Sequence, residues 1–234
     1  MSESILLRED HGAVARLTMN RPGALNALSD DMLAALRAEF TRLAEDRKIR
    51  VVVLAGAGKA FCAGHDLKEM QAAREAEDGG AAYFLDLFGR CGDVMQMLPA
   101  LPQPVIAEAH GIATAAGCQL VASCDMAVAA AGTRFGVNGV NIGLFCSTPM
   151  VALSRKVPRK VAFEMLTTGE FIDAARAREV GLVNRVVAHA DLTQAAMDLA
   201  QTIAAKLGRA VKIGKQAFYT QAEMDLAEAY QFTG

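Results

Sequence analysis

The sequence has no tryptophan, only six prolines and no uninterrupted apolar run of the length a membrane span needs. A membrane-spanning helix takes about 20 consecutive apolar residues, so we expect no membrane partner. The chain also lacks an excess of positive charge, because 24 Lys and Arg stand against 26 Asp and Glu, for a net charge of −2. Nucleic acid and anionic lipid surfaces select a basic face, so neither is expected as the main partner. A small anionic ligand held by a local cluster stays possible.

Paired cysteine motifs and metal-binding histidine motifs are also missing. No two of the five cysteines have CxxC spacing, and the four histidines are scattered. We therefore expect free thiols and no metal site. Residues 1–12 (MSESILLREDHG) resemble neither a secretory signal nor an Arg-rich transit peptide, and together with the free thiols they predict a cytoplasmic location.

What is present is an alternation of short apolar segments with helical patterns. At 234 residues and 53% apolar composition, the chain can form one large domain or two small ones. Strands are expected at Ala13–Met19, Val51–Ala55, Val105–Ala109 and Met126–Ala130. Helices are expected at Ser29–Asp46, Tyr83–Leu98, Ala115–Ser123, Lys160–Thr167, Asp173–Val180, Asp191–Leu207 and Gly208–Met224. The alternation predicts the α/β class, with a helical region after about His189.

Two strand-to-helix turns are rich in small residues, at 61–70 and 111–119. A helix start offers unpaired N–H groups, and two such turns can converge on one oxygen as an oxyanion hole. Packing alone is the alternative explanation for small residues at these positions.

Four ordered motifs make the chain resemble a known family. They are NRPGALNAL at 20–28, AGHDLKEM at 63–70, GCQL with CD at 117–125, and TGE with the GLVN pattern at 168–184. Together they resemble the crotonase (enoyl-CoA hydratase/isomerase) superfamily over nearly the whole chain. Residues 139–149 and 157–160 resemble the subgroup that contains enoyl-CoA hydratase domain-containing protein 3.

The resemblance implies a crotonase-type spiral of ββα turns, with two roughly perpendicular sheets and a helical C-terminal region. Residues 1–188 would form the core with the acyl-CoA site. Residues 189–234 would form a trimerisation region, incomplete relative to the family. An acyl-CoA or enoyl-CoA would be the ligand, in fatty acid metabolism, with no separate cofactor because coenzyme A is part of the substrate. The chain would assemble with itself as a homotrimer or a dimer of trimers.

The resemblance also assigns roles to residues. The backbone N–H groups of His65 and Ala116 would form the oxyanion hole. The acyl pocket would be shaped by Phe145, and Lys68 would touch phosphate unless it is an ordinary surface lysine. The coenzyme A channel would be lined by Ala24, Leu25, Ala63, Gly64, Asp66 and Leu67.

The resemblance places the two catalytic glutamates of the family's hydratases at positions 119 and 139, where this sequence has Gln119 and Gly139. A glutamine exchanges no proton near neutral pH and a glycine has no side chain, whereas positioned acid–base groups each contribute about 10²–10⁴-fold. The favoured hypothesis is an enoyl-CoA hydratase/isomerase-like enzyme, classed with the lyases, that stabilises an enolate but does not hydrate at an ordinary rate. The alternatives are a non-catalytic acyl-CoA-binding protein, or an isomerase or decarboxylase on the same fold.

Other polar residues could replace the lost pair. Asn138 and Asn141 could hydrogen-bond a substrate, and Cys146 is either a nucleophile or a pocket thiol. Asp86 and Asp93 either enter the acyl pocket or stay solvated. Glu108 stands in an otherwise apolar strand, and we expect an ion pair with an arginine, exposure at a sheet end, or catalysis.

Overall fold

Parallel strands joined by helical crossovers build the main sheet of this computed structural model, which describes residues 4–234. Six strands lie in the order β1-β2-β3-β4-β6-β9, and only β1 and β2 pair antiparallel. Their bounds are β1 Leu6–His11, β2 Val14–Met19, β3 Val51–Gly56, β4 Val105–Ala109, β6 Met126–Ala130 and β9 Arg185–Val187. The inner strands are buried on both faces, which explains their continuous Val-rich and Ala-rich sequences.

A second, smaller sheet adds three short strands in the order β5-β7-β8. Their bounds are β5 Ile112–Thr114, β7 Arg134–Gly136 and β8 Ile172–Asp173. Isolated parallel bridges pair Leu28 with His65, and Cys62 with Ala113 of β5. The predicted crotonase-type α/β fold with two sheets and C-terminal helices is therefore present.

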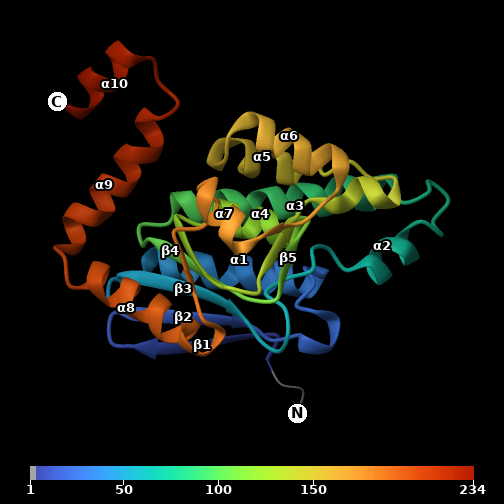
Figure 1. Cartoon of the computed structure of the whole chain (residues 1–234), viewed down its shortest axis with the longest axis horizontal. Coiled ribbons are helices and arrows are strands. Elements are labelled where there is room, and N and C mark those ends of the chain that lie inside the picture. Colours follow the sequence, from blue (N-terminus) through green and yellow to red (C-terminus); the bar gives the residue numbers. More distant parts are fainter. Residues whose placement is uncertain (1–3) are drawn as a thin grey trace.

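Helices cover both faces of the main sheet (Figure 1). On one face, α8 packs Leu192, Ala196 and Ala200 against strand residues such as Val53 and Ile106. On the other face, α1, α3 and α4 bury their apolar sides in the larger core. The helix bounds are α1 Asp30–Glu45, α2 Leu67–Ala73, α3 Ala81–Ala100, α4 Ala116–Ser123, α5 Ser147–Lys156, α6 Arg159–Thr168, α7 Ala174–Glu179, α8 Leu192–Ala204, α9 Gly208–Gln221 and α10 Leu226–Thr233.

Most predicted elements are confirmed, and local signals explain why. The Ser29 hydroxyl accepts the Met32 N–H at 3.2 Å and caps α1, as its position before the apolar stripe predicts. The helix α3 continues through Pro99 to Ala100, past the end expected at Leu98. Between α2 and α3 the chain turns with Gly79 and Gly80 at positive φ.

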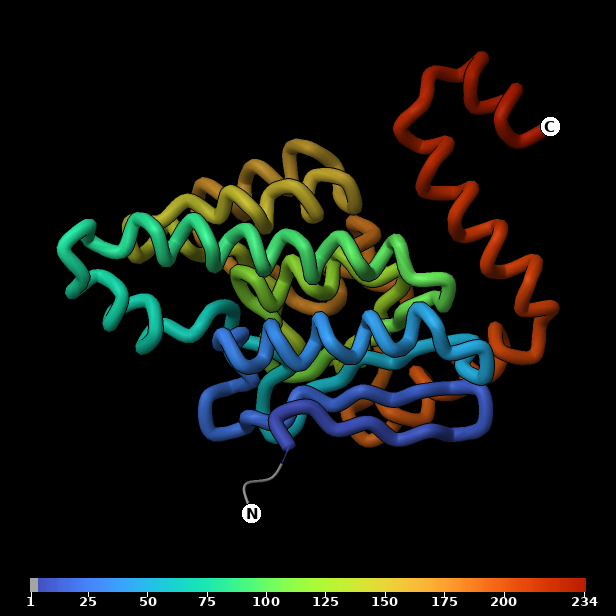
Figure 2. The backbone as a smooth tube through the Cα atoms, turned by 180° about the vertical axis from the view of Figure 1, so that it is seen from behind, coloured from blue at the N-terminus to red at the C-terminus, as the bar shows by residue number. Residues whose placement is uncertain are grey.

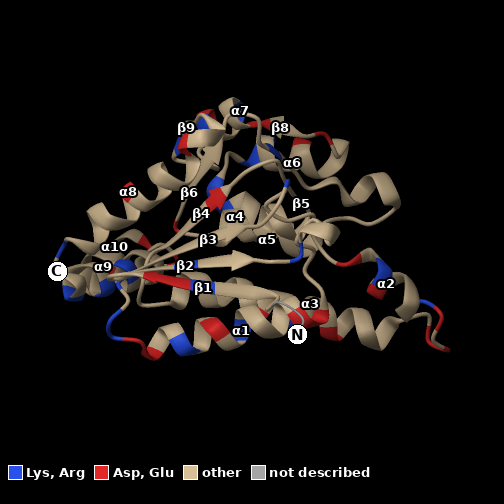
Figure 3. Cartoon of the chain, turned by 90° about the horizontal axis from the view of Figure 1, so that it is seen from below, with Lys and Arg blue, Asp and Glu red and all other residues tan. Residues whose placement is uncertain are grey.

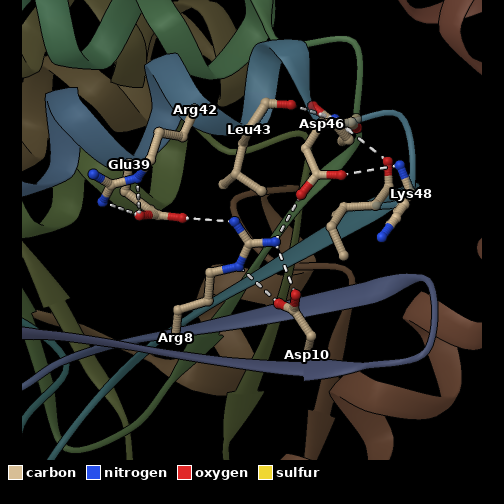
Figure 4. Close-up of polar contacts among 9 residues, drawn as sticks. Arg8, Asp10, Glu39, Arg42, Leu43, Asp46 and Lys48 are labelled. Carbon is tan, nitrogen blue, oxygen red and sulfur yellow. Dashed lines mark hydrogen bonds and ion pairs between the residues drawn. The ribbon is translucent and has the colours of Figure 1, made fainter.

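The edge strand β1 was not predicted, because its sequence LLREDH is charged and only partly apolar. Ion pairs attach it to α1 instead (Figure 4). The Arg8 guanidinium donates to Asp10 at 2.7 and 2.9 Å, to Glu39 at 3.0 Å and to Asp46 at 2.8 Å. Carboxylates that converge in this way raise the pKa of Arg8 above its ordinary value. Arg42 also contacts Glu39. Charged residues of both signs lie along α1 (Figure 3).

The C-terminal helices α9 and α10 lead away from the body of the molecule (Figure 2). One buried contact attaches α9: the Lys215 ammonium donates to the Asp125 carboxylate at 2.7 Å and to the carbonyls of Leu98 and Gln103. The Tyr219 hydroxyl donates to the same carboxylate at 2.8 Å. Within residues 4–234, no helix combines the length and apolar character that crossing a bilayer requires.

Candidate active site

A cavity of about 350 Å³ opens among α2, α3, the start of α4 and the start of α5. Its wall is mostly apolar, with Leu67 and Met70 from α2, Phe88 from α3, and Leu144 and Phe145 from the loop before α5. Such a cavity suits an apolar chain held against a few polar groups.

The two predicted turns meet at this cavity. The Cys62 N–H donates to the Ile112 carbonyl at 3.1 Å, and the Thr114 N–H donates to the Cys62 carbonyl at 3.0 Å. Gly64 lies so close to the second turn that a Cβ there would stand 3.0 Å from the Ala115 Cβ and 3.5 Å from the Ala116 nitrogen. Gly117 lies equally close to the first turn, because a Cβ added to it would stand 2.2 Å from the Cys62 carbonyl oxygen. Only glycine permits this approach of the two backbones at both positions.

The backbone immediately before α4 is strained. Ala115 has φ 49° and ψ −120°, a conformation that L side chains rarely adopt and that costs about 1–3 kcal/mol. Its own N–H donates to the Gly136 carbonyl at 2.9 Å, which holds the peptide in place. This strained turn sets the direction of the next N–H group, that of Ala116 at the first position of α4.

The N–H groups of His65 and Ala116 have no acceptor within residues 4–234. The bridge with Leu28 uses the Gly64 carbonyl and the Asp66 N–H, so it leaves the His65 N–H free. The first residue of a helix has no intrahelical acceptor for its N–H, which leaves that of Ala116 free as well. Both residues line the cavity, so two unpaired donors lie on adjoining backbone segments at its wall.

The residues predicted to form the site divide into two groups. The cavity is lined by Ala63, His65, Leu67, Ala116, Gly139 and Phe145. The other predicted residues lie outside its wall: Ala24, Leu25, Gly64, Asp66, Lys68 and Gln119.

Asp66 and Lys68, two of the outer residues, have different surroundings. The Asp66 carboxylate caps α2 through the Lys68 N–H at 3.0 Å and pairs with Arg21 at 3.0 Å. Burial alone would raise the pKa of Asp66, but the Lys68 N–H and the Arg21 guanidinium outweigh it and lower that pKa. The Lys68 side chain is exposed.

At Gln119 and Gly139, the two positions where the resemblance leads us to expect glutamates, there is no ionisable group. Gln119 is 4% exposed, and its Oε1 has no hydrogen-bond partner within the described chain. At Gly139, a Cβ would stand 2.4 Å from the Leu144 carbonyl oxygen and 2.8 Å from the Cys146 Sγ. The backbone there is packed for glycine, so this position cannot carry a side chain without moving the 144–146 segment.

The sequence pointed to Asn138 in the wall, but not to Thr114 or to the first turn of α5. The Thr114 hydroxyl lies 2.5 Å from the Asn138 Oδ1, and this pair sits beside Ala115. The first turn of α5, with Ser147, Thr148 and Pro149, forms another part of the wall. A proline in the first turn of a helix is a start signal, and it could have located α5.

The alternatives for the remaining polar residues are resolved by their contacts. Cys146 accepts the Gly139 N–H at 3.3 Å and burial raises its thiol pKa, so it is a pocket thiol and not an activated nucleophile. Asp86 and Asp93 face solvent, and each pairs with an arginine.

Glu108 is buried in an ion pair. Arg16 donates to it through Nε at 3.0 Å and Nη2 at 2.9 Å, and the Thr193 hydroxyl donates at 2.7 Å. Of the three alternatives for this carboxylate, the ion pair is correct.

A comparison with protein families matches residues 9–233 to the enoyl-CoA hydratase/isomerase model. The chain belongs to this family. It is 45% identical over 228 residues to enoyl-CoA hydratase domain-containing protein 3, mitochondrial, of Xenopus laevis, a match that covers 97% of the chain and 76% of the relative.

Solved structures of similar sequence support the same family assignment. The crystal structure of an enoyl-CoA hydratase from Mycobacterium smegmatis superposes with a TM-score of 0.95 at 57% identity, covering 99% of this chain and 89% of that one. The human enoyl-CoA hydratase domain-containing protein 3 superposes with a TM-score of 0.93 at 42% identity, covering 98% and 89%. The subgroup expected from the sequence is thus confirmed.

The predicted cytoplasmic location is contradicted by these comparisons. Relatives from Rattus norvegicus, Mus musculus, Homo sapiens and Danio rerio, like the one from Xenopus laevis, are named as mitochondrial proteins. Location follows from how a chain is targeted, and neither cysteine spacing nor the composition of residues 1–12 decides it.

Proposed function

We propose that this enoyl-CoA hydratase/isomerase family member binds an acyl-CoA thioester and stabilises its enolate with the backbone N–H groups of His65 and Ala116. The observation that carries the proposal is the pair of unpaired donors at the wall of an apolar cavity. Named relatives support the ligand, because the Clostridium acetobutylicum protein at 35% identity is a short-chain-enoyl-CoA hydratase.

The chemistry follows from where negative charge develops. Removing a proton from the carbon next to a thioester carbonyl moves charge onto the carbonyl oxygen. A fixed N–H donor at that oxygen is worth about 10²–10³-fold in rate, because it needs no reorganisation during the reaction. Gly64 and Gly117 hold the two donors on backbones in direct contact, so their separation is fixed by packing.

Hydration at an ordinary rate is not part of the proposal. A hydratase must position and deprotonate a water, and Gln119 and Gly139 supply no group for that step. The cavity wall is mostly apolar, so a longer acyl chain would bury more apolar surface there than a four-carbon chain. We therefore propose medium-chain acyl groups as the preferred ligands.

Two assays test this function. Isothermal titration with octanoyl-CoA and with butyryl-CoA measures binding, and we expect the longer chain to bind more tightly. Loss of the α-CH₂ proton signal of octanoyl-CoA in D₂O measures enolate formation, and we expect it to be saturable. A thioether analogue of octanoyl-CoA, which lacks the carbonyl oxygen, is the matched control for binding to the two donors. If neither octanoyl-CoA nor butyryl-CoA bound, the proposal would be refuted.

A second candidate function is acyl-CoA binding without catalysis. It is favoured by one observation, the lack of any carboxylate among the described residues that line the cavity. Tight binding of octanoyl-CoA with no α-proton exchange and no hydration of crotonyl-CoA would select this candidate.

Assembly into a trimer remains our proposal for the quaternary structure. Large apolar side chains on and beside α9 and α10 are exposed, among them Leu207 (72%), Leu226 (75%) and Tyr230 (73%). Burying these side chains against other copies would remove apolar surface from water. Light scattering after size exclusion checks the mass, and a monomer at micromolar concentration would contradict the trimer.

A further inference from the structure

Hydroxyl and amide side chains occupy one connected part of the otherwise mostly apolar cavity wall. Four residues of the wall carry such a group: Thr114, Asn138, Ser147 and Thr148. The Thr114 hydroxyl contacts Asn138 directly. The Gly139 N–H donates to the Cys146 Sγ at 3.3 Å, which brings the chain after Asn138 next to the chain before Ser147. A ligand in the cavity therefore meets an apolar surface with a polar strip along it.

The Thr114 hydroxyl orients the side-chain amide of Asn138. The Thr114 Oγ1 lies 2.5 Å from the Asn138 Oδ1 and 3.2 Å from the Gly136 carbonyl oxygen. A hydroxyl has one hydrogen and the shorter contact takes it, so the amide oxygen of Asn138 accepts this hydrogen bond. The amide nitrogen, on the other branch of the planar group, is left with both of its hydrogens.

The Asn138 Nδ2 is an accessible donor without an acceptor. Its amide has one hydrogen bond within residues 4–234, the one that its oxygen accepts from Thr114. Unlike the Oε1 of Gln119, the Nδ2 is not shielded from solvent, and Asn138 lines the cavity whereas Gln119 does not. Such a donor bonds to water until a ligand displaces that water. A ligand that fills this part of the cavity must supply an acceptor or leave the N–H groups unsatisfied.

The Asn138 amide is held beside one of the proposed oxyanion donors. Thr114, which orients the amide, is two residues before Ala116 in the chain. The Gly136 carbonyl oxygen that approaches the Thr114 hydroxyl also accepts the Ala115 N–H at 2.9 Å. The amide and the Ala116 N–H therefore belong to one hydrogen-bonded unit and line the same cavity. A ligand bound at the Ala116 N–H has its next polar group within the range of this amide.

We propose that Asn138 selects acyl thioesters with a carbonyl at the third carbon, that is, 3-oxoacyl-CoA. This inference rests on the proposed function, in which the thioester oxygen lies at the N–H groups of His65 and Ala116. Three carbon atoms separate that oxygen from the 3-oxygen, which accepts from the Asn138 Nδ2, whereas a saturated chain offers only C–H groups there. A carbonyl suits this donor better than a hydroxyl does, because the hydrogen of a hydroxyl needs an acceptor of its own and the Asn138 Oδ1 is already engaged.

The test compares the dissociation constants of 3-oxooctanoyl-CoA, 3-hydroxyoctanoyl-CoA and octanoyl-CoA, measured by isothermal titration for the wild type and for variants. Asn138→Leu keeps the branched shape of the side chain and removes its polar atoms. Thr114→Val keeps Asn138 but removes the hydroxyl that orients its amide. Asn20→Leu is the matched control, because the Asn20 amide donates to the Ser4 carbonyl at 3.1 Å and lies outside the cavity wall.

We expect the wild type to bind 3-oxooctanoyl-CoA about twofold to tenfold more tightly than octanoyl-CoA, which is the usual contribution of one neutral hydrogen bond. Asn138→Leu should abolish this preference and bind octanoyl-CoA within about threefold of the wild type, because the apolar wall and the backbone donors are unchanged. Thr114→Val should reduce the preference, since the amide is then free to turn over. Asn20→Leu should keep the wild-type ratio.

A second measurement uses the wild type alone, so it does not depend on the folding of a variant. In nitrogen-labelled protein, the side-chain NH₂ signal of Asn138 should shift more with 3-oxooctanoyl-CoA than with octanoyl-CoA, and equal shifts would overturn the proposal.

Three binding results would also overturn the role of Asn138 while the proposed function stands. One is a wild type that binds octanoyl-CoA as tightly as 3-oxooctanoyl-CoA, and another is a preference that survives in Asn138→Leu. The third is a wild-type preference for 3-hydroxyoctanoyl-CoA that Asn138→Leu abolishes, because the amide oxygen would then face the ligand. If the wild type bound neither octanoyl-CoA nor 3-oxooctanoyl-CoA, the proposed function itself would be refuted.

Discussion

Replacing Gly117 by alanine tests whether contact between the two turns positions the N–H groups of His65 and Ala116, which we propose as oxyanion donors. Gly117 lies in the first turn of α4, where its missing side chain faces the Cys62 peptide. A Cβ at this position would stand 2.2 Å from the Cys62 carbonyl oxygen, whereas ordinary contacts begin at 3.4 Å. One of the two backbones must therefore move by about 1 Å, the difference between these distances.

Two opposing effects set the expected magnitude. In a helix, alanine is favoured over glycine by about 1 kcal/mol. Overpacking a core costs about 1–3 kcal/mol and more where the clash is with backbone, so we expect net destabilisation by about 1–3 kcal/mol. A misplacement of about 1 Å can cost 10²-fold in rate, so α-proton exchange should fall by about that factor.

The assay combines urea unfolding with the exchange rate of octanoyl-CoA, at a temperature where Gly117→Ala is fully folded. Gly89→Ala is the matched control, because Gly89 also lies in a helix but a Cβ there meets nothing within 4 Å. The control should be stabilised by about 0.5–1 kcal/mol with an unchanged exchange rate. If Gly117→Ala were as stable and as active as the wild type, the claim that this contact fixes the donors would be wrong.

Three further predictions concern other groups. Removing the buried Glu108 carboxylate leaves Arg16 with only the longer ion pair to the exposed Glu9, at 3.7 Å, so Glu108→Ala should cost about 3 kcal/mol in urea unfolding, without loss of octanoyl-CoA binding; a cost below about 1 kcal/mol would contradict the buried pair. Gly139→Glu should destabilise the protein and fail to create crotonyl-CoA hydration, because its Cβ would meet the Leu144 carbonyl oxygen at 2.4 Å; a stable variant with new hydratase activity would show that the loop adapts. The folded-state pKa of His65 lies below about 6.5, so the unfolded state binds more protons in the window between the two values and stability falls as pH drops through it. His65→Phe should lose less stability than the wild type between about pH 7 and pH 5, and equal losses would mean that the ring is not buried neutral.

Local patterns in the sequence were enough to predict the α/β class and most elements. Strands such as β3 and β4 are apolar on both faces because helices cover both sides of the sheet, and that pattern is readable from five or six consecutive residues. The helix α1 carries its cap and its apolar stripe within its own sequence. The motifs around residues 63–70 and 117–125 likewise pointed to the family and to the two turns.

Elements held by distant partners could not be predicted in this way. The strand β1 is charged and partly exposed, and its attachment to α1 depends on Glu39 and Asp46, more than 30 residues away. Asp86 and Asp93 were candidates for the acyl pocket, and only their placement on the outer side of α3 shows that they pair with arginines instead.

The sequence by itself determined that this chain has two turns of small residues before helices, and that a glutamine and a glycine stand at positions 119 and 139. Only the tertiary structure decided what those residues do. It brings Gly64 against Ala116, some 50 residues apart, so that two free N–H groups adjoin one cavity. It also packs Gly139 against Leu144 so closely that no side chain fits, and it packs the His65 ring against Phe88. The physical reason is that propensities and motifs act over a few neighbouring residues, whereas an active site consists of distances between segments that packing alone fixes.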